Sequence, residues 1–61
     1  MKNIYIIENT NDERLGVFNT FKKAVNYIKE NYYILNHNFN GENMVFSCIN
    51  EFLYISKITV Q

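Results

Sequence analysis

The chain has 61 residues, 48% of them hydrophobic and 16% aromatic, and its six basic residues balance six acidic ones. This length predicts a single domain over residues 1–61, and the zero net charge excludes the strong field that draws basic proteins to nucleic acids and anionic membranes. The only cysteine, Cys48, cannot form an internal disulfide, and with His37 as the only histidine we expect no four-ligand zinc site, no other metal and no cofactor.

No targeting or membrane segment is expected. No apolar run approaches the roughly 20 residues of a membrane span, and the opening MKNIYII is too short for a signal peptide. Because a lone cysteine also suits a reducing compartment, the sequence predicts a cytoplasmic protein without a membrane partner.

The first predicted element is a β-hairpin. Residues Asn3–Glu8 (NIYIIE) are β-branched and aromatic with one charge, which predicts a strand buried on both faces or nearly so. The polar run NTNDER then breaks the strand, and Leu15–Phe18 (LGVF) resumes one. We therefore expect the two strands to pair around a loop of about six residues.

A helix of about eleven residues is predicted next. Thr20 is a suitable N-cap, because its hydroxyl can accept a hydrogen bond from a free amide of the first turn. Asn31 is expected to end the helix, because asparagine tolerates the left-handed conformation common at helix ends. The apolar stripe of this helix has the spacing i, i+3, i+4 and i+7 and consists of Phe21, Ala24, Val25 and Ile28.

The stretch NHNFNGENM looks more like a site than any other segment, but it predicts a hairpin tip. Asn-Gly is the favoured dipeptide of a two-residue type I′ turn, and a turn at Asn40-Gly41 places Phe39 opposite Glu42 and His37 opposite Met44. The same register makes one apolar face around His37, formed by Tyr33, Leu35, Phe39, Met44, Phe46 and Cys48. The opposite face, which is more polar, then holds Ile34, Asn36, Asn38, Asn43, Val45, Ser47 and Ile49.

A second two-residue turn is predicted at Asn50-Glu51, followed by a long strand over Phe52–Val60. This turn places Leu53 beside Cys48 and Ile55 beside Phe46. The order is thus ββαβββ, and the predicted fold is a single small α+β domain, an antiparallel sheet with one helix on one face. The helix should cover the more apolar face, which carries Leu35, Phe46, Leu53 and Ile55.

The sheet face that the helix leaves uncovered is the predicted functional surface. Large apolar side chains alternate there with small polar ones, as in many protein interfaces. The sequence therefore predicts binding of a protein, either a second copy as a homodimer or a foreign partner; the alternative is a face wetted by solvent and partly covered by chain ends. The residues expected to bind are Ile34, Val45, Ile49, Phe52, Tyr54 and Ile58.

Catalytic chemistry is not expected. His37 beside Glu42 and Tyr33 could serve as a general base, but a lone histidine on a strand face is more often structural. Cys48 is predicted on the core face, where a thiol is inert packing. The acidic residues near NTNDER lack the glycine and the terminal glutamate of a calcium loop, and no glycine-rich loop suits a phosphate or other small-molecule substrate.

A second hypothesis is a small nucleic-acid-binding protein. Lys22, Lys23 and Lys29 give the exposed face of the helix a mild positive charge, and aromatic side chains on the sheet could stack on bases. The basic residues are few, so protein binding is the leading hypothesis.

The segment LGVFNTFKKAVNYIKEN resembles a pattern in small uncharacterised proteins of phages and prophages, in which a hairpin ending in Gly-Val-Phe leads into a helix. The resemblance covers about a third of the chain and carries no functional residues. Short orphan proteins of this kind include inhibitors of host or defence enzymes, among them anti-CRISPR proteins. The resemblance thus implies an inhibitor that acts in the cytoplasm of a host cell.

Overall fold

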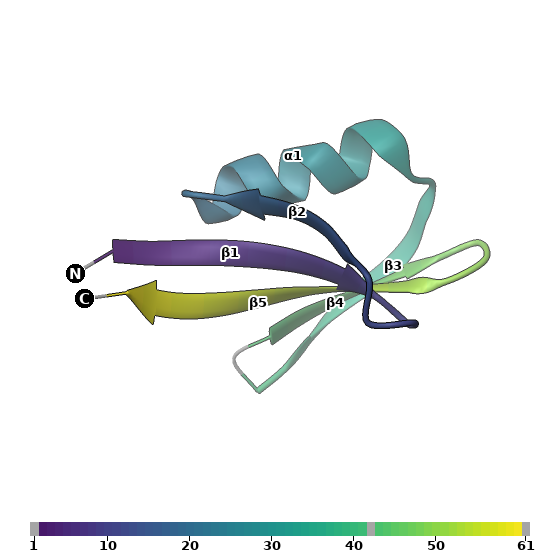
Figure 1. The fold of residues 1–61 in the computed structure, drawn as a ribbon. Helices are drawn as coiled ribbons and strands as arrows, with labels where there is room; N and C mark the ends of the chain where they lie inside the picture. Colours follow the sequence, from purple (N-terminus) through teal and green to yellow (C-terminus); the bar gives the residue numbers. More distant parts are fainter. Residues whose placement is uncertain (1, 42, 61) are drawn as a thin grey trace.

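The computed structural model describes residues 2–41 and 43–60, whose elements follow the predicted order ββαβββ. All five strands belong to one antiparallel sheet in the order β2-β1-β5-β4-β3 (Figure 1). Strands β2 and β3 are therefore the edges, and the α+β class is confirmed. The elements are β1 (Lys2–Asn9), β2 (Arg14–Phe18), α1 (Phe21–Asn31), β3 (Ile34–Asn40), β4 (Asn43–Cys48) and β5 (Phe52–Val60).

Helix α1 lies against one face of the sheet, where it contacts β1 and β2 (Figure 1). The predicted N-cap is confirmed: the Thr20 hydroxyl accepts a hydrogen bond from the Lys23 amide at 3.1 Å. The predicted end of the helix at Asn31 is confirmed in position, but the expected left-handed cap conformation is not. Asn31 is the last helical residue, and the cap is Tyr32, whose backbone is extended and whose N–H donates to the Ile28 carbonyl at 2.9 Å.

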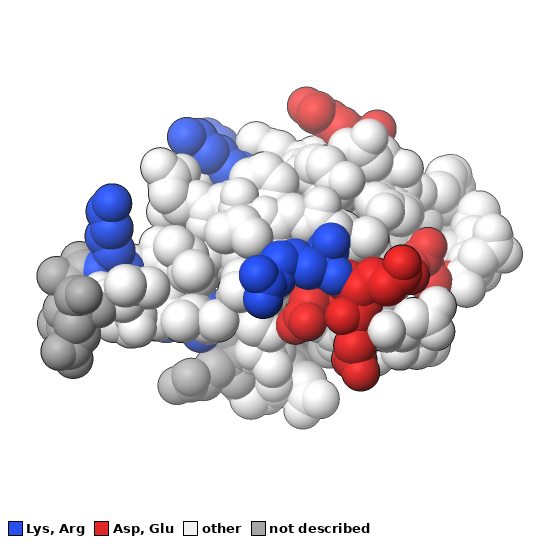
Figure 2. Space-filling view, in the orientation of Figure 1, with Lys and Arg blue, Asp and Glu red and all other residues white. Residues whose placement is uncertain are grey.

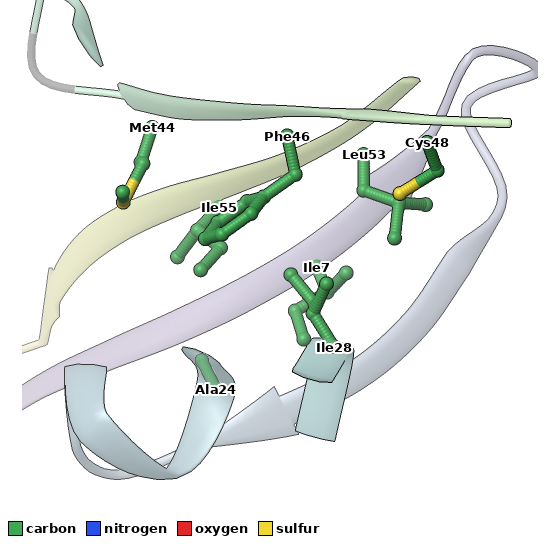
Figure 3. Packing of buried hydrophobic residues seen from close by; sticks show 8 residues of the cluster. All are labelled: Ile7, Ala24, Ile28, Met44, Phe46, Cys48, Leu53 and Ile55. Atoms are coloured by element: carbon green, nitrogen blue, oxygen red, sulfur yellow. The ribbon is translucent and has the colours of Figure 1, made fainter. Parts of the chain in front are cut away.

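The core lies between α1 and the sheet face that it covers, as Figure 3 shows. Ala24 and Ile28 of the predicted stripe are fully buried, while Phe21 at the start of the helix is 37% exposed. Phe46, Leu53 and Ile55 are also buried in this core, which confirms the predicted docking face of the helix. The buried cluster comprises Ile7, Ala24, Ile28, Met44, Phe46, Cys48, Leu53 and Ile55.

Strand β1 confirms the prediction of a strand buried on both faces only in its middle. Ile6 and Ile7 point to opposite faces and are 5% and 0% exposed, whereas Lys2 and Asn3 are exposed. The hairpin with β2 is confirmed, but its loop comprises residues 10–13 rather than about six residues, because β1 continues to Asn9 and β2 begins at Arg14.

The predicted turn between β3 and β4 is displaced by one residue. Asn40 pairs with Asn43, Phe39 with Met44, and His37 with Phe46, so Asn40 belongs to the ladder and not to the turn. Gly41 has a φ of 66°, the left-handed conformation that suits glycine. The predicted pairing of Phe39 with Glu42 is wrong, because Phe39 opposes Met44, and position 42 itself lies outside the described residues.

A β-bulge in β3 overturns the predicted faces of the residues before it. The register shifts between Ile34 and Asn36, so Ile34 opposes Cys48 and packs against the core cluster. Ile34 therefore lies on the covered face and not on the uncovered one. Tyr33 and Leu35 were expected in the apolar face, but they are 70% and 62% exposed. Tyr33 precedes β3, and Leu35 lies at the bulge of this edge strand.

The second predicted turn is also displaced by one residue, in the other direction. The Cys48 amide donates to the Glu51 carbonyl at 2.9 Å, and Ser47 opposes Phe52. The chain therefore reverses at Ile49 and Asn50 rather than at Asn50-Glu51, which leaves Ile49 outside the strands.

Candidate functional site

The sheet face opposite α1 has no helix over it in the described part of the chain, and we call it the open face. Its members follow from the register, because residues directly opposite each other in antiparallel strands share a face. Ile6 opposes Val17 on one side and Ser56 on the other, and Tyr54 lies between Glu8 and Val45. The apolar members are Ile4, Ile6, Val17, Val45, Phe52, Tyr54, Ile58 and Val60.

Several of these apolar side chains are nearly half exposed to solvent. Val17 and Phe52 are 49% and 48% exposed, and Ile58 and Val60 are each 43% exposed. Ile6 lies at the centre of the patch and is already buried by its neighbours. Apolar side chains on four neighbouring strands, from Val17 on β2 to Val45 on β4, give this face the character of an interface.

Polar and charged groups surround this apolar patch. Asn36, Asn38, Ser47 and Ser56 also lie on the open face, as the register of β3, β4 and β5 requires. The charged members lie toward its ends, with Lys2 at the start of β1 and the opposed pair Glu8 and Arg14 near the other end. Figure 2 shows side chains of both signs beside one another, surrounded by uncharged surface.

The structure places four of the six predicted binding residues on the open face. Val45, Phe52, Tyr54 and Ile58 lie there; Phe52 and Ile58 are exposed, whereas Val45 and Tyr54 are half-buried. Ile34 lies on the covered face and Ile49 in the β4–β5 turn, so both predicted placements are wrong.

Sequence reasoning missed the part of the open face that β1 and β2 contribute. Ile4, Ile6 and Val17 belong to it because β1 pairs with β5, which brings the two ends of the chain together. The alternation within NIYIIE could have assigned Ile4 and Ile6 to one face. It could not have shown that this face continues that of β5, because the strand order was not predictable from the chain.

A hollow lies on the helix side of the sheet, between the first turn of α1 and the tip of the β3–β4 hairpin. It has a volume of about 400 Å³ and is lined by Tyr5, Phe21, Phe39, Gly41, Ile55 and Lys57. The rings of Tyr5 and Phe21 meet edge to face with centroids 5.9 Å apart. Phe39 is 70% exposed, so the predicted apolar face remains uncovered at this end.

The two residues considered for catalysis occupy separate environments. His37 is exposed on β3, with its ring centroid 6.0 Å from that of Phe46. Cys48 is buried at the end of β4, where burial and the nearby Glu51 carboxylate raise the pKa of the thiol. A raised pKa keeps the thiol protonated and disfavours nucleophilic chemistry.

Groups that could hold a metal do not assemble among the described residues, where no three His, Cys, Asp or Glu side chains gather. Within residues 2–41 and 43–60, no helix combines the length and apolarity needed to cross a membrane. The acidic residues of the β1–β2 loop are exposed, and Asp12 has a φ of 61°.

No family model, curated protein or solved structure matches the chain.

Proposed function

We propose that the protein is a non-enzymatic binding module whose open face docks on a protein partner. The observation that carries the proposal is the apolar patch of the open face, exposed at Val17, Phe52 and Ile58. Removing such side chains from water stabilises a complex by about 25 cal/mol per Å² of apolar area, and aromatic anchors contribute strongly.

The character of the partner follows from the chemistry of the patch. Its centre is aliphatic and aromatic, its asparagines and serines are uncharged, and its charged groups lie only toward the ends, so the surface suits a partner with an apolar face of its own. The resemblance of LGVFNTFKKAVNYIKEN to small phage and prophage proteins supports an inhibitor of a host or defence protein, comparable to anti-CRISPR proteins in size and role. Such an inhibitor acts by covering a surface and needs no chemistry of its own.

The test compares two pairs of truncations in pull-downs from a bacterial lysate. Phe52→Ala with Tyr54→Ala removes the aromatic anchors of the open face and should weaken partner capture roughly 30-fold or more, as for interface hot spots. Tyr33→Ala with Ile49→Ala truncates side chains that are 70% and 62% exposed elsewhere and should leave capture unchanged. Thermal unfolding of each variant verifies that it is folded. Equal capture by both double variants would contradict the assigned surface.

Nucleic-acid binding is the alternative that a parallel measurement separates. A fluorescence titration with random oligonucleotides at two salt concentrations should show no binding that depends on Lys22 and Lys23. Tight, strongly salt-dependent binding that is lost in Lys22→Ala with Lys23→Ala would instead identify a nucleic-acid-binding protein.

A further inference from the structure

The two edges of the sheet differ in how well they are protected. Natural proteins protect edge strands with charges, prolines, bulges, short lengths or covering elements, because the unpaired backbone groups of an edge attract another strand. Strand β2 has five residues, begins with Arg14 and is contacted by α1. Strand β3 has seven residues, and no other described strand pairs with its outer side.

Strand β3 carries almost none of these protective features. Its sequence ILNHNFN contains no lysine, arginine, acidic residue or proline, and every residue after Ile34 is exposed. The bulge between Ile34 and Asn36 is its one irregularity. From Asn36 to Asn40 the strand pairs regularly with β4, so its outer edge is a straight row of alternate N–H and C=O groups.

We propose that β3 pairs antiparallel with β3 of a second copy of this chain, which joins two sheets into one. The occupant is a second copy because the edge is self-complementary. In a two-fold interface each strand pairs with its own copy, so a charged residue near the axis would lie close to the same charge of the second copy. β3 contains no lysine, arginine, aspartate or glutamate, and the formal net charge of the whole chain is zero at pH 7.

The geometry selects one register, with the two-fold axis at Asn38. This register uses only the regular segment and places Asn38 opposite Asn38 of the second copy. His37 then opposes Phe39 of the second copy, which forms two aromatic pairs on one face, and Asn36 opposes Asn40 on the other. Asparagine amides both donate and accept hydrogen bonds, so these pairs are complementary. An axis at His37 would instead place the bulged Leu35 inside the new ladder.

The proposed dimer forms through the backbone edge of β3, which borders the open face at Asn36 and Asn38 but does not include its apolar patch, so each proposal can fail without the other. Pairing of one strand from each copy buries a small area, which predicts a weak association. Sedimentation of the wild type from about 1 μM to about 1 mM should therefore show a shift from monomer to dimer. A chain that stays monomeric over this range would overturn the proposal and leave the edge to a strand of a different protein.

A charge at the axis tests the surface. In Asn38→Lys the two lysines would face each other across the axis, and the dissociation constant should rise at least tenfold. Asn26→Lys makes the same change on the exposed side of α1 and should leave dimerisation unchanged. A dimer that survives Asn38→Lys would refute the proposal, and if Phe52→Ala with Tyr54→Ala abolished that dimer, its interface would be the open face.

Disulfide trapping tests the register. Directly opposed residues of antiparallel strands have Cα atoms about 4.5–5.5 Å apart, within the range that a disulfide spans. Under mild oxidation Asn38→Cys should form a covalent dimer. Asn36→Cys should not, because its two copies would lie about 14 Å apart along the strands. The wild type controls for Cys48, which is buried. Trapping at position 36 and not at position 38 would refute the register.

Discussion

At the scale of single residues, Asn9 organises the β1–β2 loop. Its side chain oxygen accepts hydrogen bonds from the amides of Asn11 and Glu13 at 2.9 and 3.0 Å, and its amide group donates to the Glu13 carboxylate at 3.1 Å. Asn9 is 8% exposed and is the one buried polar residue in the described chain. The left-handed Asp12 completes the turn by donating its N–H to the Asn9 carbonyl at 3.0 Å.

Asn9→Ala should therefore destabilise the protein by about 2–3 kcal/mol, because it removes three hydrogen bonds worth about 0.5–1.5 kcal/mol each. For a domain of this size the melting temperature should fall by about 10–20 °C. Asn11→Ala is the matched control, since Asn11 is exposed in the same loop. Equal melting temperatures for the two variants would show that the side chain of Asn9 does not stabilise the loop.

The sequence did not single out Asn9, and the reason is physical. NTNDER contains two asparagines, either of which can bond to a nearby backbone. Which one is buried depends on where β1 ends, and the pairing of Asn9 with Leu53 of β5 extends β1 to that point. The pairing of β1 with β5, which are far apart in the sequence, thus determines which asparagine of the loop is buried.

At the scale of elements, a glycine allows β2 to pack against α1. A Cβ atom at Gly16 would lie 2.8 Å from Cε2 of Phe18, whose ring folds back over the glycine on the covered face. The Phe18 ring in turn meets Tyr27 of α1 with centroids 5.4 Å apart. Gly16 is therefore required for this close approach rather than for an unusual backbone angle.

Gly16→Ala should destabilise the protein by about 1–2 kcal/mol, the usual cost of an overpacked contact. In the background of Phe18→Leu the same change should cost less, because leucine lacks the ring atoms that the new methyl group meets. A double-mutant cycle by urea denaturation measures this coupling. If the alanine costs the same in both backgrounds, the clash with Phe18 is not its cause.

The faces of the C-terminal strands were predictable although both turns were misplaced. When a two-residue turn moves by one position, each residue faces a new partner that lies two positions away from the old one on the opposite strand. Because side chains alternate, the old and the new partner point to the same face. Phe39 therefore opposes Met44 instead of residue 42, and Leu53 opposes Phe46 instead of Cys48, without any change of face. Alternating hydrophobicity thus determines the faces more firmly than turn chemistry determines the register.

The bulge in β3 and the part of the sheet that the helix covers were not predictable in the same way. A bulge reverses the alternation, so Ile34 enters the core while Leu35 is exposed. A helix is about 10 Å across and strands lie about 4.8 Å apart, so one helix lying along the strands covers about two of them. Phe39 is exposed because it belongs to β3, the edge strand farthest from the strands β1 and β2 that α1 contacts, and the sequence alone could not predict this strand order.

At the scale of the whole molecule, a chain of 61 residues has a small margin of stability. The described part of the chain leaves no buried side-chain nitrogen or oxygen without a hydrogen-bond partner, so the core carries no penalty of that kind. Because the margin is small, groups that become harder to ionise on folding can change the overall stability noticeably. Cys48 and Tyr32 are two such groups.

The pKa of the Cys48 thiol is raised by burial and by the Glu51 carboxylate, and that of Tyr32 by burial, Tyr27, Glu51 and Cys48. Below their ordinary pKa values, about 8.5 for cysteine and 10 for tyrosine, both groups are neutral in the folded and the unfolded chain. As the pH rises past these values the unfolded chain ionises first, so stability is lost until the folded pKa is passed. The midpoint of urea denaturation should therefore fall between about pH 8 and pH 10.5.

Variants separate the two groups across this alkaline range. Cys48→Ala should lose about 1 kcal/mol at neutral pH from its smaller side chain, yet its midpoint should fall less between about pH 8 and pH 9.5 than that of the wild type. Tyr32→Phe should instead flatten the decline above about pH 9.5. If Cys48→Ala declines in parallel with the wild type, the thiol is as easily ionised in the folded chain as in the unfolded one. Its burial in the core cluster would then not hold in solution, because a buried thiol must resist ionisation.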